Sequence, residues 1–200
     1  MSRASAGPAN RASKYRPEDD FYVTPPEASR PFIAAAEPWL RGRTIWEPAC
    51  GAGDLSREMI AAGHSVVSSN LIDRGYGHIG HDFLAVPETD IDCIVTNPPF
   101  SLVNNFALHA INLNVEFVAL FAKTKFLEGD KRYKTILAPH PPTFVYQFIE
   151  RIKFYAGDTA REDQPGWNTE AFAWFVWLRG ETGEPRIRWL RRGERVDPVS

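Results

Sequence analysis

The chain has 200 residues, of which 44% are hydrophobic and 12% aromatic. This is enough for one α/β domain with a real core and leaves little for a second domain. A net charge of −2 excludes a nucleic-acid packaging protein, although it allows a local basic patch. Two cysteines, Cys50 and Cys93, and the absence of a secretory or membrane-spanning run predict a cytoplasmic protein that has reduced thiols and no membrane partner.

The chain divides into three parts by composition. Residues 1–18 are small, polar and mildly basic without periodicity, which predicts a flexible arm. Residues 19–180 carry the apolar periodicities of a single folded domain, and 181–200 form an Arg-rich C-terminal extension with room for one short strand. The five histidines show no metal-ligand spacing, so we expect no metal.

The first elements are a loop, 20–27, and a helix, 28–39, in which Phe32, Ile33 and Ala36 recur at helical spacing. Thr24 stands near the expected helix start, where a threonine and a following proline are typical of a cap and a first turn. By itself, the sequence TPPE predicts only the start of this helix.

A glycine-containing loop then joins a short strand, 44–46, to a helix, 55–62. Glycines at this position allow backbone N–H groups to approach a ligand closely, with a helix N-terminus behind them. The next strand, 64–69, completes a βαβ unit and ends at Asn70. Polar residues at the end of such a strand commonly hold nucleoside hydroxyls, and the candidates are Asn70 and Asp73.

Asp82 and Phe83 follow a Gly-rich turn. An adenine ring can stack on Phe83 while Asp82 accepts a hydrogen bond from its amino group. The alternative is that Phe83 is an ordinary core residue and Asp82 a turn former.

The stretch 92–101, DCIVTNPPFS, predicts a buried strand that delivers Asn97 and an aromatic residue to its carboxyl end. Pro98 and Pro99 fix φ and remove two backbone N–H groups, so the carbonyls of this turn have no competing donors. The Asn97 amide oxygen and the Pro98 carbonyl suit the two protons of a planar NH₂ group, and Phe100 suits its ring. The alternative is a simple strand-to-helix turn.

The second half predicts a helix, 102–113, and an apolar strand, 115–122. A basic run follows, which either contacts phosphates or is a solvated face; it contains Lys123, Lys125, Lys131, Arg132 and Lys134. Strand material at 143–154, a polar loop at 157–169 and a central apolar strand at 171–178 complete the domain.

Taken together and in this order, TPPE, EPACGAG, DFL and NPPF resemble the S-adenosylmethionine-dependent adenine-N6 methyltransferases of DNA, most of all the short phage and prophage enzymes. The resemblance covers residues 21–106 well. It implies a class I, Rossmann-like α/β methyltransferase fold with a seven-stranded, mostly parallel sheet, one antiparallel strand and helices on both faces. Residues 19–180 would then be the catalytic domain.

The resemblance also implies the roles of individual residues. The target base would be held by Asn97, Pro98, Pro99 and Phe100. An aromatic residue, Phe154 or its rival Tyr155, would stack on the base from the other side. Independently of the resemblance, the basic residues Lys123, Lys125 and Arg151 are the candidates for contact with DNA. Similar enzymes usually carry a carboxylate where this chain has Asn70, so ribose binding falls to Asn70 or Asp73. The cofactor would be bound by Thr24, Pro25, Glu47, Pro48, Ala49, Cys50, Gly51, Gly53, Asn70, Leu71, Asp73, Asp82, Phe83 and Asn97.

The expected activity is methyl transfer from S-adenosylmethionine to N6 of a flipped adenine in DNA, leaving S-adenosylhomocysteine. We expect a monomer or weak homodimer in the cytoplasm of a bacterial host, encoded by the bacterium or by a phage. Two alternatives use the same chemistry, namely methylation of an RNA adenine or of a protein glutamine. A third is a non-catalytic module that binds DNA or a protein.

Overall fold

A computed structural model describes residues 21–153 and 170–192. The expectations for the arm 1–18, for Phe154 and Tyr155, for the loop 157–169 and for residues beyond 192 lie outside the described residues. The helices are α1 (Pro26–Leu40), α2 (Asp54–Ala61), α3 (Val103–Asn112) and α4 (Asp130–Arg132), the last continuing into a helical turn at Tyr133–Leu137. The strands are β1 (Thr44–Glu47), β2 (Ser65–Asn70), β3 (His78–Ile79), β4 (Cys93–Thr96), β5 (Phe117–Lys123), β6 (Phe144–Phe148), β7 (Phe172–Leu178) and β8 (Arg186–Leu190).

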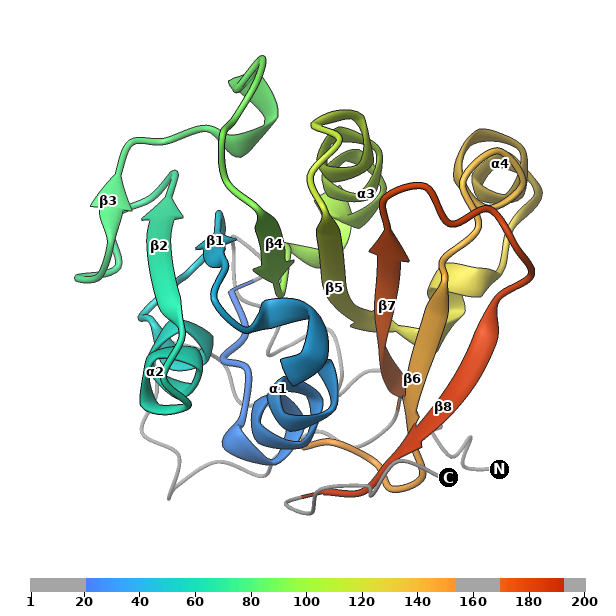
Figure 1. Cartoon of the computed structure of the whole chain (residues 1–200), viewed down its shortest axis with the longest axis horizontal. Coiled ribbons are helices and arrows are strands. Elements are labelled where there is room, and N and C mark those ends of the chain that lie inside the picture. The colour runs from blue at the N-terminus through green and yellow to red at the C-terminus, as the bar shows by residue number, and fades with distance from the viewer. Residues whose placement is uncertain (1–20, 154–169, 193–200) are drawn as a thin grey trace, which may run out of the picture.

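The described strands form one sheet in the order β3-β2-β1-β4-β5-β7-β6-β8 (Figure 1). All neighbours are parallel except β7, which runs antiparallel to both β5 and β6. The predicted mostly parallel sheet with one antiparallel strand is therefore confirmed. It has eight strands where seven were expected, because Arg186–Leu190 of the C-terminal extension pairs with β6 and satisfies that strand's outer backbone groups.

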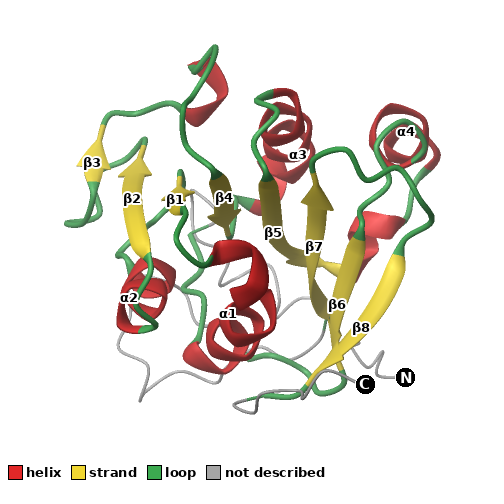
Figure 2. Cartoon of the chain, viewed as in Figure 1, coloured by secondary structure: helices red, strands yellow, loops and turns green. Residues whose placement is uncertain are grey.

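Both faces of the sheet are covered by helices, as predicted (Figure 2). Alternate residues of β4 point to opposite sides, since the side-chain period of a strand is two. Cys93 and Val95 join a core with residues of α1 and α2, whereas Ile94 joins a second core with residues of α3. The near-continuous apolar sequence of β4 follows from this burial on both faces.

The expected strand 143–154 is too long. β6 ends at Phe148, and Ile149 closes the ladder by donating its N–H to the Leu190 carbonyl. Residues 149–153 then leave the sheet, so Arg151 follows the strand instead of belonging to it. The apolar pattern misled the prediction because Ile149 and Ile152 continue it past the last backbone pairing.

The predicted central strand at 171–178 is confirmed as β7, and its Trp174 is fully buried. The indole stacks on Phe32 of α1 with ring centroids 4.1 Å apart, and Nε1 donates to the Ala28 carbonyl at 3.1 Å. We expect Trp174→Ala to lower the free energy of unfolding by about 3–5 kcal/mol in urea denaturation. Trp189, which is 58% exposed on β8, is the matched control, and its alanine variant should stay within about 0.5 kcal/mol of the parent. Equal losses at the two positions would contradict this packing.

No helix in the described ranges, 21–153 and 170–192, is both long and apolar enough to cross a membrane.

Candidate active site

A cavity of about 390 Å³ lies at the carboxyl ends of β1, β2 and β4, where parallel sheets place their sites. Five segments meet there: the residues before α1, the glycine loop after β1, the loop after β2, the turn after β3, and the turn after β4. The lining residues of the described chain are Phe21, Tyr22, Val23, Thr24, Glu47, Pro48, Ala49, Cys50, Gly51, Asp54, Leu55, Asn70, Leu71, Ile72, Arg74, His81, Asp82, Phe83, Leu84, Asn97, Pro99, Ser101, Leu102 and Phe106.

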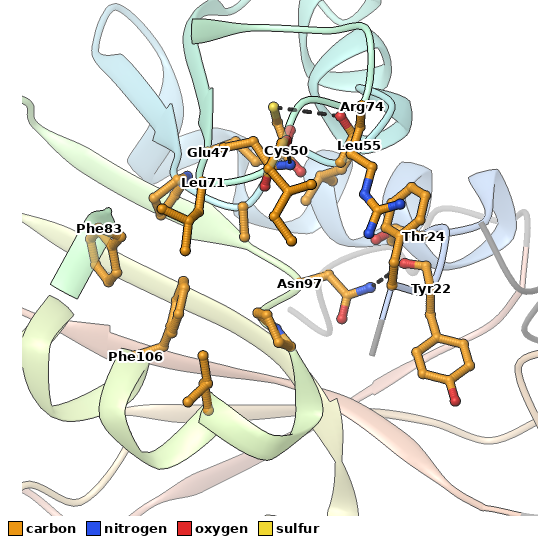
Figure 3. A pocket seen from close by; sticks show the side chains of 18 of the residues that line it. Tyr22, Thr24, Glu47, Cys50, Leu55, Leu71, Arg74, Phe83, Asn97 and Phe106 are labelled. Atoms are coloured by element: carbon orange, nitrogen blue, oxygen red, sulfur yellow. Dashed lines mark hydrogen bonds between the residues drawn. The ribbon is translucent and has the colours of Figure 1, made fainter. Parts of the chain in front are cut away.

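The two ends of the cavity differ in chemistry (Figure 3). Phe83, Leu71 and Phe106 gather at one end, which is apolar and suits a flat ring. Thr24, Arg74 and Asn97 lie toward the other end, which presents a hydroxyl, a guanidinium and an amide. An elongated ligand with an aromatic head and a polar tail matches this arrangement.

The glycine loop needs its glycines. Gly51 and Gly53 both have left-handed φ, of 55° and 84°, and Gly53 stands immediately before α2. The ring of Phe21 fills the space that a Cβ would need at Gly51, and the ring of Tyr76 does the same at Gly53. The loop after β2 thus packs directly against the glycine loop through Tyr76, and other residues of the same loop line the cavity.

Gly77 provides a test of this packing. A Cβ there would lie 2.7 Å from the Ser68 carbonyl oxygen and 2.9 Å from the Cys50 Sγ atom, whereas at Gly75, with a similar positive φ, it would meet nothing within 4 Å. In both variants, an alanine in left-handed backbone lowers the free energy of unfolding by about 1 kcal/mol. We therefore expect Gly77→Ala to melt clearly lower than Gly75→Ala and to bind ligand in the cavity more weakly. Identical melting and binding of the two variants would contradict the close contact.

Glu47 lies at the floor of the cavity and is only 2% exposed. Ser56 of α2 donates a hydrogen bond to its carboxyl group, and the Ser56 and Ser68 hydroxyls are 2.6 Å apart. Burial raises the pKa of Glu47 from its ordinary 4.5 to about 8, against the opposing effect of the Ser56 hydrogen bond. Burial therefore favours the neutral, protonated form of this carboxyl group in the ligand-free chain.

Asn97 presents an acceptor into the site. Its Nδ2 donates to the Tyr22 carbonyl at 3.1 Å, which sets the orientation of the amide. Its Oδ1 is buried and accepts no hydrogen bond from any residue that the structure describes. Buried acceptors without a donor are costly, so this atom indicates a ligand that donates to it.

Phe100 stands beside the cavity and carries a crowded ring. Tyr22 stacks on it with centroids 4.8 Å apart and planes 17° apart. Phe172 lies 5.7 Å away, and the Lys123 ammonium is 5.0 Å from the ring centroid and 2.7 Å from the Glu170 carboxylate. Lys123 is therefore held at the predicted base-binding aromatic, and part of its charge is balanced by Glu170.

Comparisons of the sequence find no matching protein-family model and no matching curated protein. Solved structures do match. A "putative RNA methyltransferase" from Pyrococcus horikoshii aligns with a TM-score of 0.58 and 14% identity over 79% of this chain and 86% of its own. A dimethyladenosine transferase from Plasmodium falciparum aligns with a TM-score of 0.53 and 13% identity over 79% and 63%. The chain has the methyltransferase fold.

A third solved structure, the M protein of the type I restriction enzyme EcoKI, aligns with a TM-score of 0.52 and 14% identity. The alignment covers 82% of this chain and 45% of the M protein, so this chain spans less than half of that larger protein. At these identities the comparisons establish the methyltransferase fold alone. What the fold does in this chain has to be argued from its own residues.

Within the methyltransferase fold, most of the predicted cofactor residues line one cavity. They are Thr24, Glu47, Pro48, Ala49, Cys50, Gly51, Asn70, Leu71, Asp82, Phe83 and Asn97, with Pro99 beside them. Pro25 and Gly53, the residues just before α1 and α2, and Pro98, two residues after the end of β4, are not among the lining residues. Phe83 is at once a core residue, against Trp46 and Phe106, and a cavity wall.

Between the two ribose candidates, Asn70 reaches the cavity and Asp73 does not. The Asp73 carboxylate is exposed and accepts from the Gly75 N–H at 2.9 Å, so it stabilises the turn. Asn70 lines the cavity, although its Nδ2 already donates to the Ile72 carbonyl at 2.5 Å. The side-chain oxygen of Asp82 accepts from the Leu84 N–H, so it also has the turn-forming role that was the alternative.

The predicted basic run is largely engaged within the protein. Arg132 donates to the Asn104 side chain and to three backbone carbonyls, which holds the turn after β5 against α3. Lys134 pairs with Asp130 at 2.8 Å. Lys125 and Arg151 have exposed positions near the carboxyl ends of β5 and β6. Arg132 thus stabilises this turn, which is neither of the two alternatives, phosphate contact or a solvated face, that the sequence left open for the basic run.

Sequence reasoning missed several lining residues, among them Phe21, Tyr22, Leu55, Arg74, Leu102 and Phe106. The DFYV directly before TPPE was a usable signal, because the residues preceding a ligand loop share its location. Arg74 had none, since it lies in a turn whose sequence indicates only flexibility. Among the residues that the structure describes, no three His, Cys, Asp or Glu side chains gather at a common point.

Proposed function

We propose that this chain transfers the methyl group of S-adenosylmethionine to the exocyclic N6 amino group of adenine in DNA, by direct in-line attack after the base has flipped out. The observation that carries the proposal is the buried Asn97 Oδ1, which lacks a donor among the described residues. Asn97 lines the polar end of a cavity whose two ends match an aromatic head and a charged tail. The proposal draws further support from the likeness to the fold of other methyltransferases.

The cavity residues fit the cofactor in chemistry. Phe83, Leu71 and Phe106 would enclose an adenine ring, with Asp82 accepting from its amino group. Asn70 would meet the ribose, and Glu47 with the glycine loop would surround the methionine end. When bound, S-adenosylmethionine supplies an electrophilic methyl group on a sulfonium.

The Asn97 turn would activate the attacking amine. Asn97 Oδ1 and the Pro98 carbonyl would accept hydrogen bonds from the two amino N–H groups, which opposes delocalisation of the nitrogen lone pair into the ring and raises its nucleophilicity. As the N–C bond forms and the C–S bond breaks, the nitrogen would release one proton to solvent. The Tyr22 carbonyl keeps the Asn97 amide in the accepting orientation, because it already binds the Nδ2 side. Correct positioning of base and methyl supplies much of the remaining rate.

Flipping a base costs a few kcal/mol, and stacking on Phe100 offsets part of that cost, at about 1–3 kcal/mol per stacked base. A base that takes the face of Phe100 now covered by Tyr22 displaces that ring. Lys123, Lys125 and Arg151 lie near the same edge of the sheet and are the proposed phosphate contacts. A monomer or weak homodimer acting on DNA, with S-adenosylhomocysteine as the product and no metal required, completes the proposal.

The test is transfer of labelled methyl to four substrates in parallel: adenine-containing duplex DNA, single-stranded DNA, RNA and a glutamine peptide. Nucleoside analysis should find N6-methyladenine in DNA. Methylation of RNA or of the glutamine peptide would support the proposed reaction and would replace DNA as the proposed substrate. If no substrate is labelled although calorimetry shows cofactor binding, the assignment to DNA is overturned in favour of a binding module.

A further inference from the structure

Arg74 occupies the polar end of the cavity and belongs to none of the sequence motifs TPPE, EPACGAG, DFL and NPPF. Its guanidinium lies over the Phe21 ring, with Cζ 4.7 Å from the ring centroid. The same ring packs against Gly51 of the glycine loop. Arg74 is therefore held above the glycine loop by an aromatic spacer, at the end that also carries Thr24 and Asn97 (Figure 3).

The charges around the cavity make this arginine distinctive. The described residues that line the cavity include three with carboxyl groups, Glu47, Asp54 and Asp82. Arg74 is the one arginine or lysine among these described lining residues. An arginine keeps its charge at all physiological pH values. Stacking on Phe21 fixes the position of the guanidinium at this end of the cavity. A guanidinium is planar and matches the geometry of a carboxylate, with which it can form two parallel hydrogen bonds.

We infer that Arg74 binds the carboxylate of the amino-acid tail of the ligand, that is, the methionine end of S-adenosylmethionine. The inference rests on the proposed function and adds the residue that recognises one end of its cofactor. The aromatic head of the ligand would bind at the opposite, apolar end of the cavity, so different residues would recognise the two ends of the ligand. Arg74 is a binding residue in this assignment and takes no part in the transfer itself.

Arg57 offers a matched control. It too lies over an aromatic ring that packs on the glycine loop, with Cζ 4.5 Å from the Tyr76 centroid. It donates to the Ala52 carbonyl at 2.7 Å and does not line the cavity. If removing any arginine from this region weakens ligand binding, the loss of affinity should be equal at the two positions. If the arginine recognises the carboxylate, only substitution of Arg74 should weaken the ligand that carries it.

The experiment measures calorimetric affinities of two ligands for the full chain and for Arg74→Ala, Arg74→Lys and Arg57→Ala. S-adenosylhomocysteine carries the carboxylate, and 5′-methylthioadenosine has the same head without the amino-acid tail. We expect Arg74→Ala to weaken S-adenosylhomocysteine by about 10- to 100-fold, as for loss of a charge-assisted hydrogen bond, and to leave methylthioadenosine unchanged. Arg74→Lys should restore part of the loss, and Arg57→Ala should affect both ligands equally or neither.

An equal loss of both ligands in Arg74→Ala would overturn the inference and leave the proposed function standing. A ligand-selective loss in Arg57→Ala as large as that in Arg74→Ala would overturn it as well. If the parent chain binds neither ligand, the proposed function fails and this inference fails with it. Thermal melting controls for misfolding, because Arg74→Ala should melt near the parent temperature. If Arg74→Ala melts lower, the affinities of Arg74→Lys for the two ligands are compared instead. A selective loss of S-adenosylhomocysteine then supports the inference, and an equal loss of both ligands overturns it.

Discussion

Replacing Asn97 with alanine is expected to reduce methyl transfer by about 10²–10³-fold, because it removes an acceptor placed where the amino group must be activated. The affinity for S-adenosylhomocysteine should change far less, since the rest of the cavity is untouched. The fold should survive, because the main loss in the free protein is the hydrogen bond to the Tyr22 carbonyl, at about 1 kcal/mol. Single-turnover transfer and calorimetry measure the two quantities separately.

Asn105 is the matched control for this substitution. It is an exposed asparagine on α3, a few residues beyond the site, and Asn105→Ala should keep the parent rate. An Asn97→Ala variant with full activity would remove the role assigned to this amide. A variant that instead loses ligand affinity and rate together would indicate that Asn97 serves mainly to hold the cofactor.

Glu47→Gln is expected to abolish a large pH dependence of stability. The folded chain raises the pKa of this buried carboxyl to about 8, so between pH 4.5 and 8 the folded state binds a proton that the unfolded state has released. The stabilisation is fully present below pH 4.5 and is lost as the pH rises through 8. The shift corresponds to about 5 kcal/mol once the carboxylate is charged in the folded state. The neutral amide of glutamine carries no such cost.

The measurement is urea denaturation of both proteins from pH 5 to 8.5, without ligand. The parent should lose stability steadily across this range, and Glu47→Gln should lose much less. Burial also raises the pKa of the Cys50 and Cys93 thiols to about 12, but these act only above pH 9, outside the range. Glu88→Gln, on an exposed loop, is the control and should follow the parent. Parallel slopes for all three proteins would show that Glu47 does not hold a proton in the fold.

The sequence by itself determined most of the helices and strands and half of the residues that line the cavity. The β-branched apolar run through Ile94 and Val95 requires burial on both faces, and a strand so buried lies in a parallel sheet with its site at the carboxyl end. The glycine loop and Asn97 follow strands directly, so the fold class alone brings them together. These features depend on neighbours a few residues apart, which is the range that periodicity and turn chemistry report.

Only the tertiary structure decided which side chains share a space across long separations. Arg74 reaches the cavity because Phe21, more than fifty residues earlier, supports it, whereas Asp73 turns away to its own loop. The guanidinium of Arg132 donates hydrogen bonds to carbonyls of the turn after β5. The eighth strand exists because Arg186–Leu190 meets the open edge of β6. Such pairings depend on geometry set by the whole chain, because the local sequence of a turn or a charged run is equally compatible with a ligand, an internal partner or solvent.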